Sequence, residues 1–130
     1  MAEYQFNIPG KPVAKGRPRS FRAGNRIIVA TPEATRKWER MAALEMKVQM
    51  KGRPMLTGLL WLNANFYFKS TEEGYRVERP DIDNLIKSAM DAMSGIVFAD
   101  DAAIVSITAN KVNTKKGAAM TRLEIGEERK

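Results

Sequence analysis

Residues 56–69 form the longest stretch in which side chains alternate as they do in a β-strand. One set of alternating positions is wholly apolar and contains Leu60, Leu62, Ala64, Phe66 and Phe68. The other set is half apolar and contains Leu59, Trp61, Asn63, Asn65 and Tyr67. This pattern is typical of a central strand that lies under a second layer or at a subunit contact. We therefore expect a sheet built around this strand, with helices packed on its wholly apolar face.

A first helix is expected before this strand. Thr31-Pro32-Glu33 predicts its start, with Thr31 as the N-cap and Pro32 in the first helical position. Gly52 and Pro54 predict its end near Lys51. Helical spacing places one apolar stripe along it, formed by Ala34, Trp38, Met41, Leu44 and Val48.

A second helix is expected after the strand, from Asp81 or Asp83 to about Ser94, because Gly95 follows as a stop signal. Its buried face is predicted to contain Ile82, Leu85, Ile86, Ala89 and Met93.

Shorter strands are expected at residues 4–8, 26–29 and 103–112, and residues 120–125 are expected to return as the hairpin partner of 103–112. The 130 residues contain no internal repeat and fit one domain, 1–130. The predicted fold class is α+β: a mixed sheet of about four to five strands packed against two main helices.

The charge of the chain indicates a polyanionic partner. Lys and Arg number 22 against 15 Asp and Glu, which gives a net charge of +7. No acid lies between Glu3 and Glu33, and that interval holds six basic residues: Lys11, Lys15, Arg17, Arg19, Arg22 and Arg26. Pro and Gly between them predict loops or a short hairpin at residues 11–30, suited to phosphate contact. A solvated loop that only aids solubility is the alternative. Arg76 and Arg79 are assigned to the same expected DNA surface.

Two absences limit the chemistry. The chain has no Cys and no His. Thiol nucleophiles, Cys-ligated zinc, iron–sulfur clusters and Ser-His-Asp triads are therefore excluded. Catalysis would rely on carboxylates, Lys or hydroxyls, or on a metal held by oxygen, for which Mg²⁺ or Mn²⁺ is the natural choice.

No apolar run approaches the ~20 residues that span a bilayer. Residues 1–5 lack the features of a signal peptide, so a cytoplasmic protein without membrane contact is expected.

Four of the five aspartates lie in one motif, Arg79-Pro80-Asp81-Ile82-Asp83-Asn84-Leu85-Ile86-Lys87, and in the later pair Asp100-Asp101. Asp83 and Lys87, at i and i+4, share one accessible edge of the second helix. Asp81 and Asp83 lie at the positive end of that helix, which stabilises ionised carboxylates. These acids fit a Mg²⁺ site for phosphodiester cleavage, but they equally fit an N-cap, a surface ion pair and a turn.

The same residues resemble the RusA family of Holliday junction resolvases. The family pattern is Arg-x-Asp-x-Asp-Asn-Leu-x-Lys at a helix start, followed by an Asp-Asp pair before a strand. All of these positions are present here, within a likeness that covers residues 56–125. Gly16-Arg17-Pro18-Arg19 also matches a subset of the family.

The resemblance implies a small homodimeric α+β endonuclease, of a kind often encoded by phages and prophages, that cuts four-way DNA junctions with magnesium. It implies that Asp81, Asp83 and Asp101 are catalytic acids that bind the metal, that Lys87 is the catalytic lysine, and that Asp100 is an auxiliary ligand. Two alternatives stay open: a basic nucleic-acid-binding module without catalysis, and a metal nuclease for flaps, forks or RNA.

Overall fold

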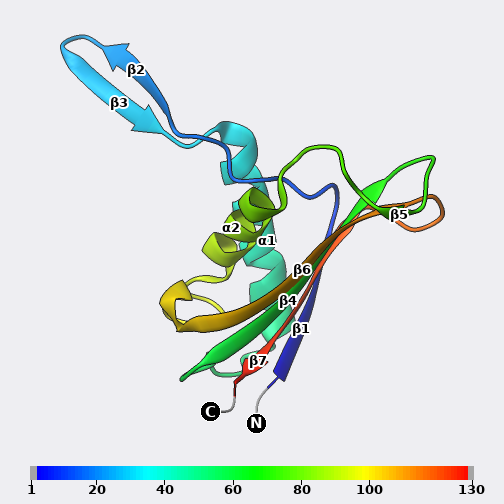
Figure 1. Cartoon of the computed structure of the whole chain (residues 1–130). Helices are drawn as coiled ribbons and strands as arrows, with labels where there is room; N and C mark the ends of the chain where they lie inside the picture. The colour runs from blue at the N-terminus through cyan, green and yellow to red at the C-terminus, as the bar shows by residue number, and fades with distance from the viewer. Residues whose placement is uncertain (1–2, 129–130) are drawn as a thin grey trace.

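A computed structural model describes residues 3–128, apart from the side chain of Arg19 (Figure 1). Five strands form one mixed sheet in the order β1-β7-β4-β6-β5. Their bounds are Glu3–Pro9 for β1, Met120–Glu127 for β7, Leu60–Lys69 for β4, Ile104–Thr114 for β6 and Gly74–Tyr75 for β5. The helices are α1 (Glu33–Met50), α2 (Ile82–Met93) and the 3₁₀ turn η1 (Asp101–Ala103). The predicted α+β class, with a five-stranded mixed sheet and two main helices, is confirmed.

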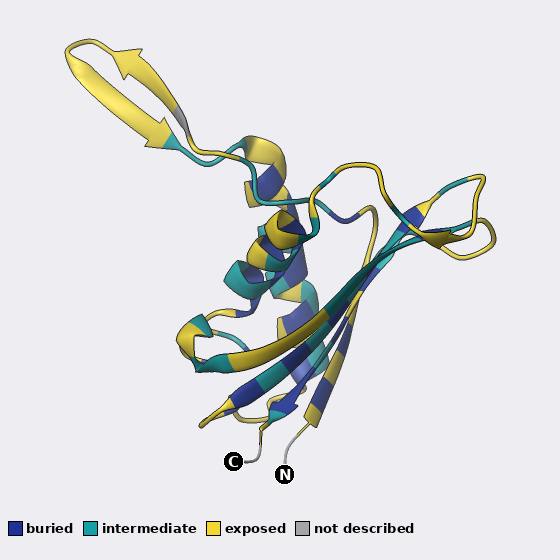
Figure 2. Ribbon diagram, viewed as in Figure 1, coloured by how far each residue is buried: buried dark blue, intermediate teal, exposed yellow. Residues whose placement is uncertain are grey.

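β4 is the central strand, as its side-chain pattern predicts. It pairs in parallel with β6 and antiparallel with β7. Its wholly apolar face is buried and faces α1 and α2, which both cover this side of the sheet (Figures 1 and 2). The core that results includes Leu62 and Phe66 from β4, Trp38 from α1, and Leu85 and Met93 from α2. The opposite face of β4 is only partly buried.

The prediction that the last two strands, β6 and β7, pair as a hairpin is wrong. β7 does not pair with β6; it lies between β1 and β4. The connection from β6 therefore passes over the end of β4, where the Lys69 ammonium donates to the carbonyls of Lys115 at 3.0 Å and Gly117 at 2.9 Å. β4 has apolar side chains to bury and two free edges, so inserting it between β6 and β7 gives each of its edges a partner.

The buried face of α1 also differs from the predicted stripe. The buried residues are Thr35, Trp38, Ala42, Met46 and Met50, whereas Leu44 and Val48 are 62% and 74% exposed. Thr35 is buried because its hydroxyl donates to the carbonyl of Ala14 and accepts from the backbone N–H of Gly16. Packing of residues 13–16 against α1 thus decides which face turns inward.

The start of α1 differs by one position from the prediction. The helix begins at Glu33, and Pro32, rather than Thr31, occupies the N-cap position without a side-chain cap. The bounds of α2 agree with the predicted range, but Ile82 and Ile86 are only partly buried. Ser88 takes a buried place instead, because its hydroxyl donates to the carbonyl of Val13 at 2.7 Å.

Strands β2 (Arg19–Ala23) and β3 (Arg26–Ala30) form a separate hairpin that projects from the body of the molecule (Figure 1). We call residues 17–31 the arm. It is almost entirely exposed (Figure 2). The exposed residues include the apolar Phe21 and Ile27. The two ends of the arm lie together, since a Cβ on Gly16 would come within 2.7 Å of Pro32 Cγ. No described residue of the arm belongs to the hydrophobic core.

No helix within residues 3–128 is long and apolar enough to cross a membrane.

Gly126 in β7 leaves room for an indole from β4. A Cβ at this position would lie 2.8 Å from Cζ2 and 3.0 Å from Nε1 of Trp61. We expect Gly126→Ala to lower the free energy of unfolding by about 1–3 kcal/mol, measured by urea denaturation. Adding Trp61→Phe should recover part of that loss, because phenylalanine lacks the crowded atoms. Equal loss in both backgrounds would contradict this explanation.

Candidate active site

Asp81 occupies the N-cap position of α2 but does not cap it. Its carboxylate makes no hydrogen bond to the helix, and the Arg79 guanidinium lies 3.3 Å from Oδ1 instead. Asp83 is exposed in the first turn of the same helix. A cap would use its carboxylate oxygen for the N–H groups of the first turn. The Asp81 carboxylate therefore remains available to a ligand, at the positive end of the helix dipole.

The two neighbouring acids before β6 differ in their roles. Asp100 Oδ1 accepts from the backbone N–H of Ala102 at 3.1 Å and so caps η1. Asp101 makes no such bond, and its Oδ2 lies 3.9 Å from the Lys87 ammonium. The predicted catalytic lysine and one predicted acid are thus brought together from separate elements, whereas Asp100 has a local structural role.

Lys87 lies on the same helix as Asp83 and approaches Asp101, which lies on a separate element. It is four residues after Asp83 on α2, and its ammonium also lies 3.3 Å from Asp91 Oδ1. Within residues 3–128 no three acidic side chains converge closely enough to enclose a metal ion. The donor set still fits magnesium, because exposed carboxylates supply the oxygen ligands that this ion prefers. Asp81, Asp83 and Asp101 therefore remain predicted ligands.

Two basic side chains fix the loop that leads into the motif. The Lys111 ammonium donates to the carbonyls of Glu78 at 3.0 Å and Pro80 at 2.9 Å. The Arg76 guanidinium donates to the Arg79 carbonyl at 2.9 Å and to Asn113 Oδ1, also at 2.9 Å. Both lysine and arginine hold the backbone beside Asp81 against β6. The sequence does not indicate this role of Lys111, because a lysine in a strand has the same pattern as any exposed polar residue.

Comparison with known proteins identifies the family of this chain. The model of the endodeoxyribonuclease RusA family matches residues 9–125. The chain belongs to the RusA family. It is also similar to YqaN of Bacillus subtilis strain 168, described as an uncharacterized protein, with 24% identity over 122 residues that cover 82% of this chain and 85% of the relative. Membership of the RusA family indicates an endonuclease that acts on branched DNA.

The basic residues of this RusA-family chain fall into two groups. Arg17, Arg22 and Arg26 are exposed on or beside the arm, and Arg79 is 86% exposed next to Asp81. The side chain of Arg19 lies outside the described part of the structure. Lys11 is exposed and lines a pocket of about 170 Å³ with Lys69 and Arg76. These side chains remain predicted DNA contacts.

The second group has partners inside the protein. Arg76 is only 14% exposed and is committed to the carbonyl and amide described above. Lys15 lies 3.0 Å from both Glu39 Oε2 and Asp91 Oδ2. Burial by itself would lower the pKa of Lys15, but hydrogen bonds and charge attraction from Asp91 and Glu39 outweigh it and raise the pKa above its ordinary value. Internal acceptors thus hold most of the N–H donors of Lys15 and Arg76, which makes these two predicted DNA contacts less available than the exposed arginines.

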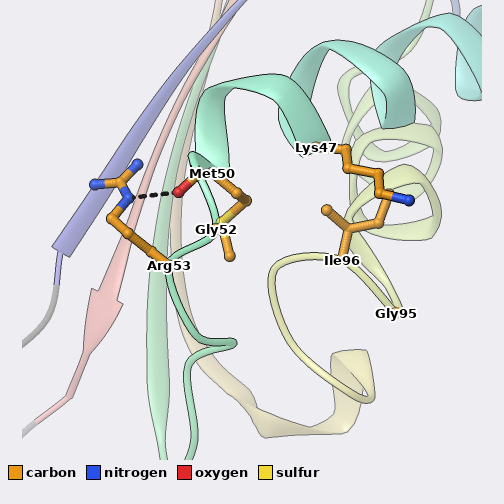
Figure 3. Close-up of a pocket in the computed structure, with 6 residues that line it drawn as sticks. All are labelled: Lys47, Met50, Gly52, Arg53, Gly95 and Ile96. Carbon is orange, nitrogen blue, oxygen red and sulfur yellow. Dashed lines mark hydrogen bonds between the residues drawn. The ribbon is translucent and has the colours of Figure 1, made fainter.

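A separate pocket of about 390 Å³ lies at the other end of α2 (Figure 3). Lys47 and Met50 of α1, Gly52, Arg53, Gly95 and Ile96 line it. Arg53 donates to the Met50 carbonyl at 2.9 Å, so its guanidinium completes the end of α1. Met93, the last residue of α2, is about 15 Å from Asp83 along the helix axis, at ~1.5 Å per residue. The described lining includes no carboxylate, so this pocket does not extend the acidic site.

Proposed function

We propose that this RusA-family protein is a Mg²⁺-dependent endonuclease that resolves four-way DNA junctions by paired, symmetric phosphodiester cleavage. The observation that carries the proposal is the approach of Lys87 on α2 to Asp101 on η1. Lys87 lies on the helix whose N-cap residue, Asp81, makes no side-chain cap hydrogen bond. A caps-only interpretation would have Asp81 bonded to its own helix, and it is not.

Asp81, Asp83 and Asp101 are the residues that would hold magnesium, with Mn²⁺ as a substitute. When bound, the ion supplies an activated water and offsets the negative charge that develops at the scissile phosphate. The ammonium of Lys87 is proposed to stabilise that charge or to orient the leaving oxygen. Asp100 is proposed to act on the reaction only by fixing the turn that presents Asp101.

DNA contact is assigned to the arm and to the exposed arginine beside the acids. Arg17, Arg19, Arg22 and Arg26 in the arm, with Arg79 at the site, supply positive charge for the phosphate backbone. Because the arm projects from the body, it can reach backbone phosphates that lie away from the body (Figure 1). We do not assign Lys15 and Arg76 to this set, since internal acceptors hold most of their N–H donors.

A homodimer is proposed because two symmetric cuts need two symmetric sites. The partly buried face of β4 with Trp61 and Tyr67 supports it, since α1 and α2 both pack on the other face of the sheet (Figure 1). The sheet thus presents aromatic side chains that neither helix covers.

The test is cleavage of a mobile four-way junction with Mg²⁺ or Mn²⁺, compared with duplex, flap, fork and RNA substrates. We expect paired, symmetric nicks in the junction and at least ~10-fold slower cleavage of duplex. Fastest cleavage of flaps or forks would replace the junction assignment with another branched substrate. Salt-dependent binding without cleavage at any metal concentration would instead support a non-catalytic binding module.

A further inference from the structure

Four charged side chains form a chain of ion pairs that ends at Asp101. Lys15 lies 3.0 Å from Asp91 Oδ2, and Asp91 Oδ1 lies 3.3 Å from the Lys87 ammonium. Lys87 in turn approaches Asp101 Oδ2 at 3.9 Å. Each oxygen of Asp91 therefore serves a different lysine. We call Lys15, Asp91 and Lys87 the relay.

Helix stability does not explain an aspartate at position 91. Asp91 lies in the last turn of α2, where the negative end of the dipole disfavours a carboxylate. The Lys87–Asp91 pair also runs in the less favourable order, with the cation four residues before the acid. A helical surface pair of this kind contributes little to stability. The position of Asp91 therefore needs a reason outside helix stability, and its ion pairs with Lys15 and Lys87 supply one.

Lys15 is fixed on three sides. Its ammonium contacts Glu39 of α1 and Asp91 of α2, while its backbone N–H donates to the carbonyl of Asn84 at 2.8 Å. Its side chain is 25% exposed, against 55% for Lys87. Lys87 alone would be a flexible four-carbon side chain with many rotamers in solvent. Asp91 limits that freedom, and Lys15 holds Asp91.

We infer that Asp91 is a positioning residue that holds the Lys87 ammonium at the acidic site, with Lys15 fixing Asp91 in turn. The inference rests on the proposed function, because orientation of Lys87 matters for rate only if Lys87 acts on the phosphate. Misplacement of a reacting group by about 1 Å can cost roughly 100-fold in rate. Lys15 directly precedes Gly16 at the base of the arm, so the relay also joins the proposed DNA-binding segment to the catalytic lysine.

The first test is a double-mutant cycle on the full-length chain. Single-turnover cleavage of a junction is measured with saturating enzyme and Mg²⁺, and junction binding is measured separately without metal. We expect Asp91→Asn to slow cleavage by about 10- to 100-fold while Kd changes less than about 2-fold. In the Lys87→Ala background, Asp91→Asn should cost less than about 2-fold, because its target is gone. A purely structural role would cost the same in both backgrounds and would overturn the inference.

Matched variants separate charge from position. Lys15→Met should reproduce part of the Asp91→Asn loss, and Lys15→Arg should restore it, since arginine can still pair with Asp91. Glu45→Gln removes a carboxylate from α1 outside the relay and should leave the rate within about 2-fold of the unaltered protein. An unchanged rate in Asp91→Asn would overturn the inference while leaving the proposed function in place.

A second measurement does not depend on cleavage. Side-chain NMR of the lysine ammonium and Cε groups in metal-free protein reports their mobility, and Lys87→Ala assigns the Lys87 signal. We expect the Lys87 signal to be ordered in the unaltered protein and to gain mobility in Asp91→Asn. An equally mobile Lys87 in both proteins would overturn the relay. If the unaltered protein cuts no branched DNA with any metal, the proposed function fails, and this measurement alone decides whether Asp91 holds Lys87.

Discussion

Asp101→Asn is expected to slow junction cleavage by at least roughly 10²- to 10³-fold, because it removes the charged oxygen that faces Lys87 and that we assign to the metal. Asparagine keeps the shape of the side chain, and Asp101 is 31% exposed, so the fold should be retained. The melting temperature should change by no more than about 2–4 °C, and junction affinity without metal by less than about 2-fold. Single-turnover kinetics, thermal unfolding and a binding titration measure the three quantities.

Glu33→Gln is the matched control for this variant. Glu33 is an exposed acid in the first turn of α1, as Asp83 is in α2, but it lies outside the acidic site. Its substitution should leave the rate within about 2-fold of the unaltered protein. Full activity of Asp101→Asn would remove Asp101 from the assigned site. Calorimetric titration with Mg²⁺ then shows whether the remaining acids bind metal.

Excision of the arm should remove most of the DNA affinity without unfolding the protein. Gly16 and Pro32 are adjacent, so a short Gly-Ser linker can replace residues 17–31. The arm contains four arginines, Arg17, Arg19, Arg22 and Arg26. Each neutralised phosphate contributes ~0.9 to the slope of log K against log salt, so the slope should fall by about 3–4 if all four make contact. Affinity near ~100 mM salt should drop at least ~10-fold.

The intact arm with all four arginines changed to glutamine is the control for this excision. It should show the same loss of slope, because the effect is assigned to charge and not to the hairpin backbone. Circular dichroism and thermal unfolding should show the core unchanged in both variants. An unchanged salt slope after excision would move DNA binding to other basic residues, such as Lys11 and Arg79.

Much of the fold could be predicted from local pattern. The alternation in β4 gave its central position and its buried face, since side chains on a strand alternate with a period of two. The Gly95 stop and the start at Asp81 or Asp83 gave the bounds of α2. The motif around Asp81 and Lys87 indicated the RusA family, which the family comparison confirms. The motif positions Asp81, Asp83, Lys87 and Asp101 remain predicted catalytic residues.

The face of α1 could not be predicted from hydrophobicity. Thr35 is polar and yet buried, because its hydroxyl donates a hydrogen bond to the carbonyl of Ala14, which is distant in the sequence. Once that contact forms, Leu44 and Val48 turn outward although they are apolar. The position of β7 between β1 and β4 could not be predicted from local pattern either. Strand pairing depends on which strand edges are free in the whole sheet.

The sequence by itself determined the chemistry of this protein: oxygen ligands without Cys or His, a basic chain, and the family motif around Asp81 and Lys87. Only the tertiary structure decided how those groups are used. In the folded chain the Asp81 carboxylate does not cap α2, and Asp100 caps the turn η1. Asp91 pairs with both Lys15 and Lys87. The physical reason is that residue type sets what an atom can donate or accept, whereas its actual partner depends on chain segments that meet only after folding.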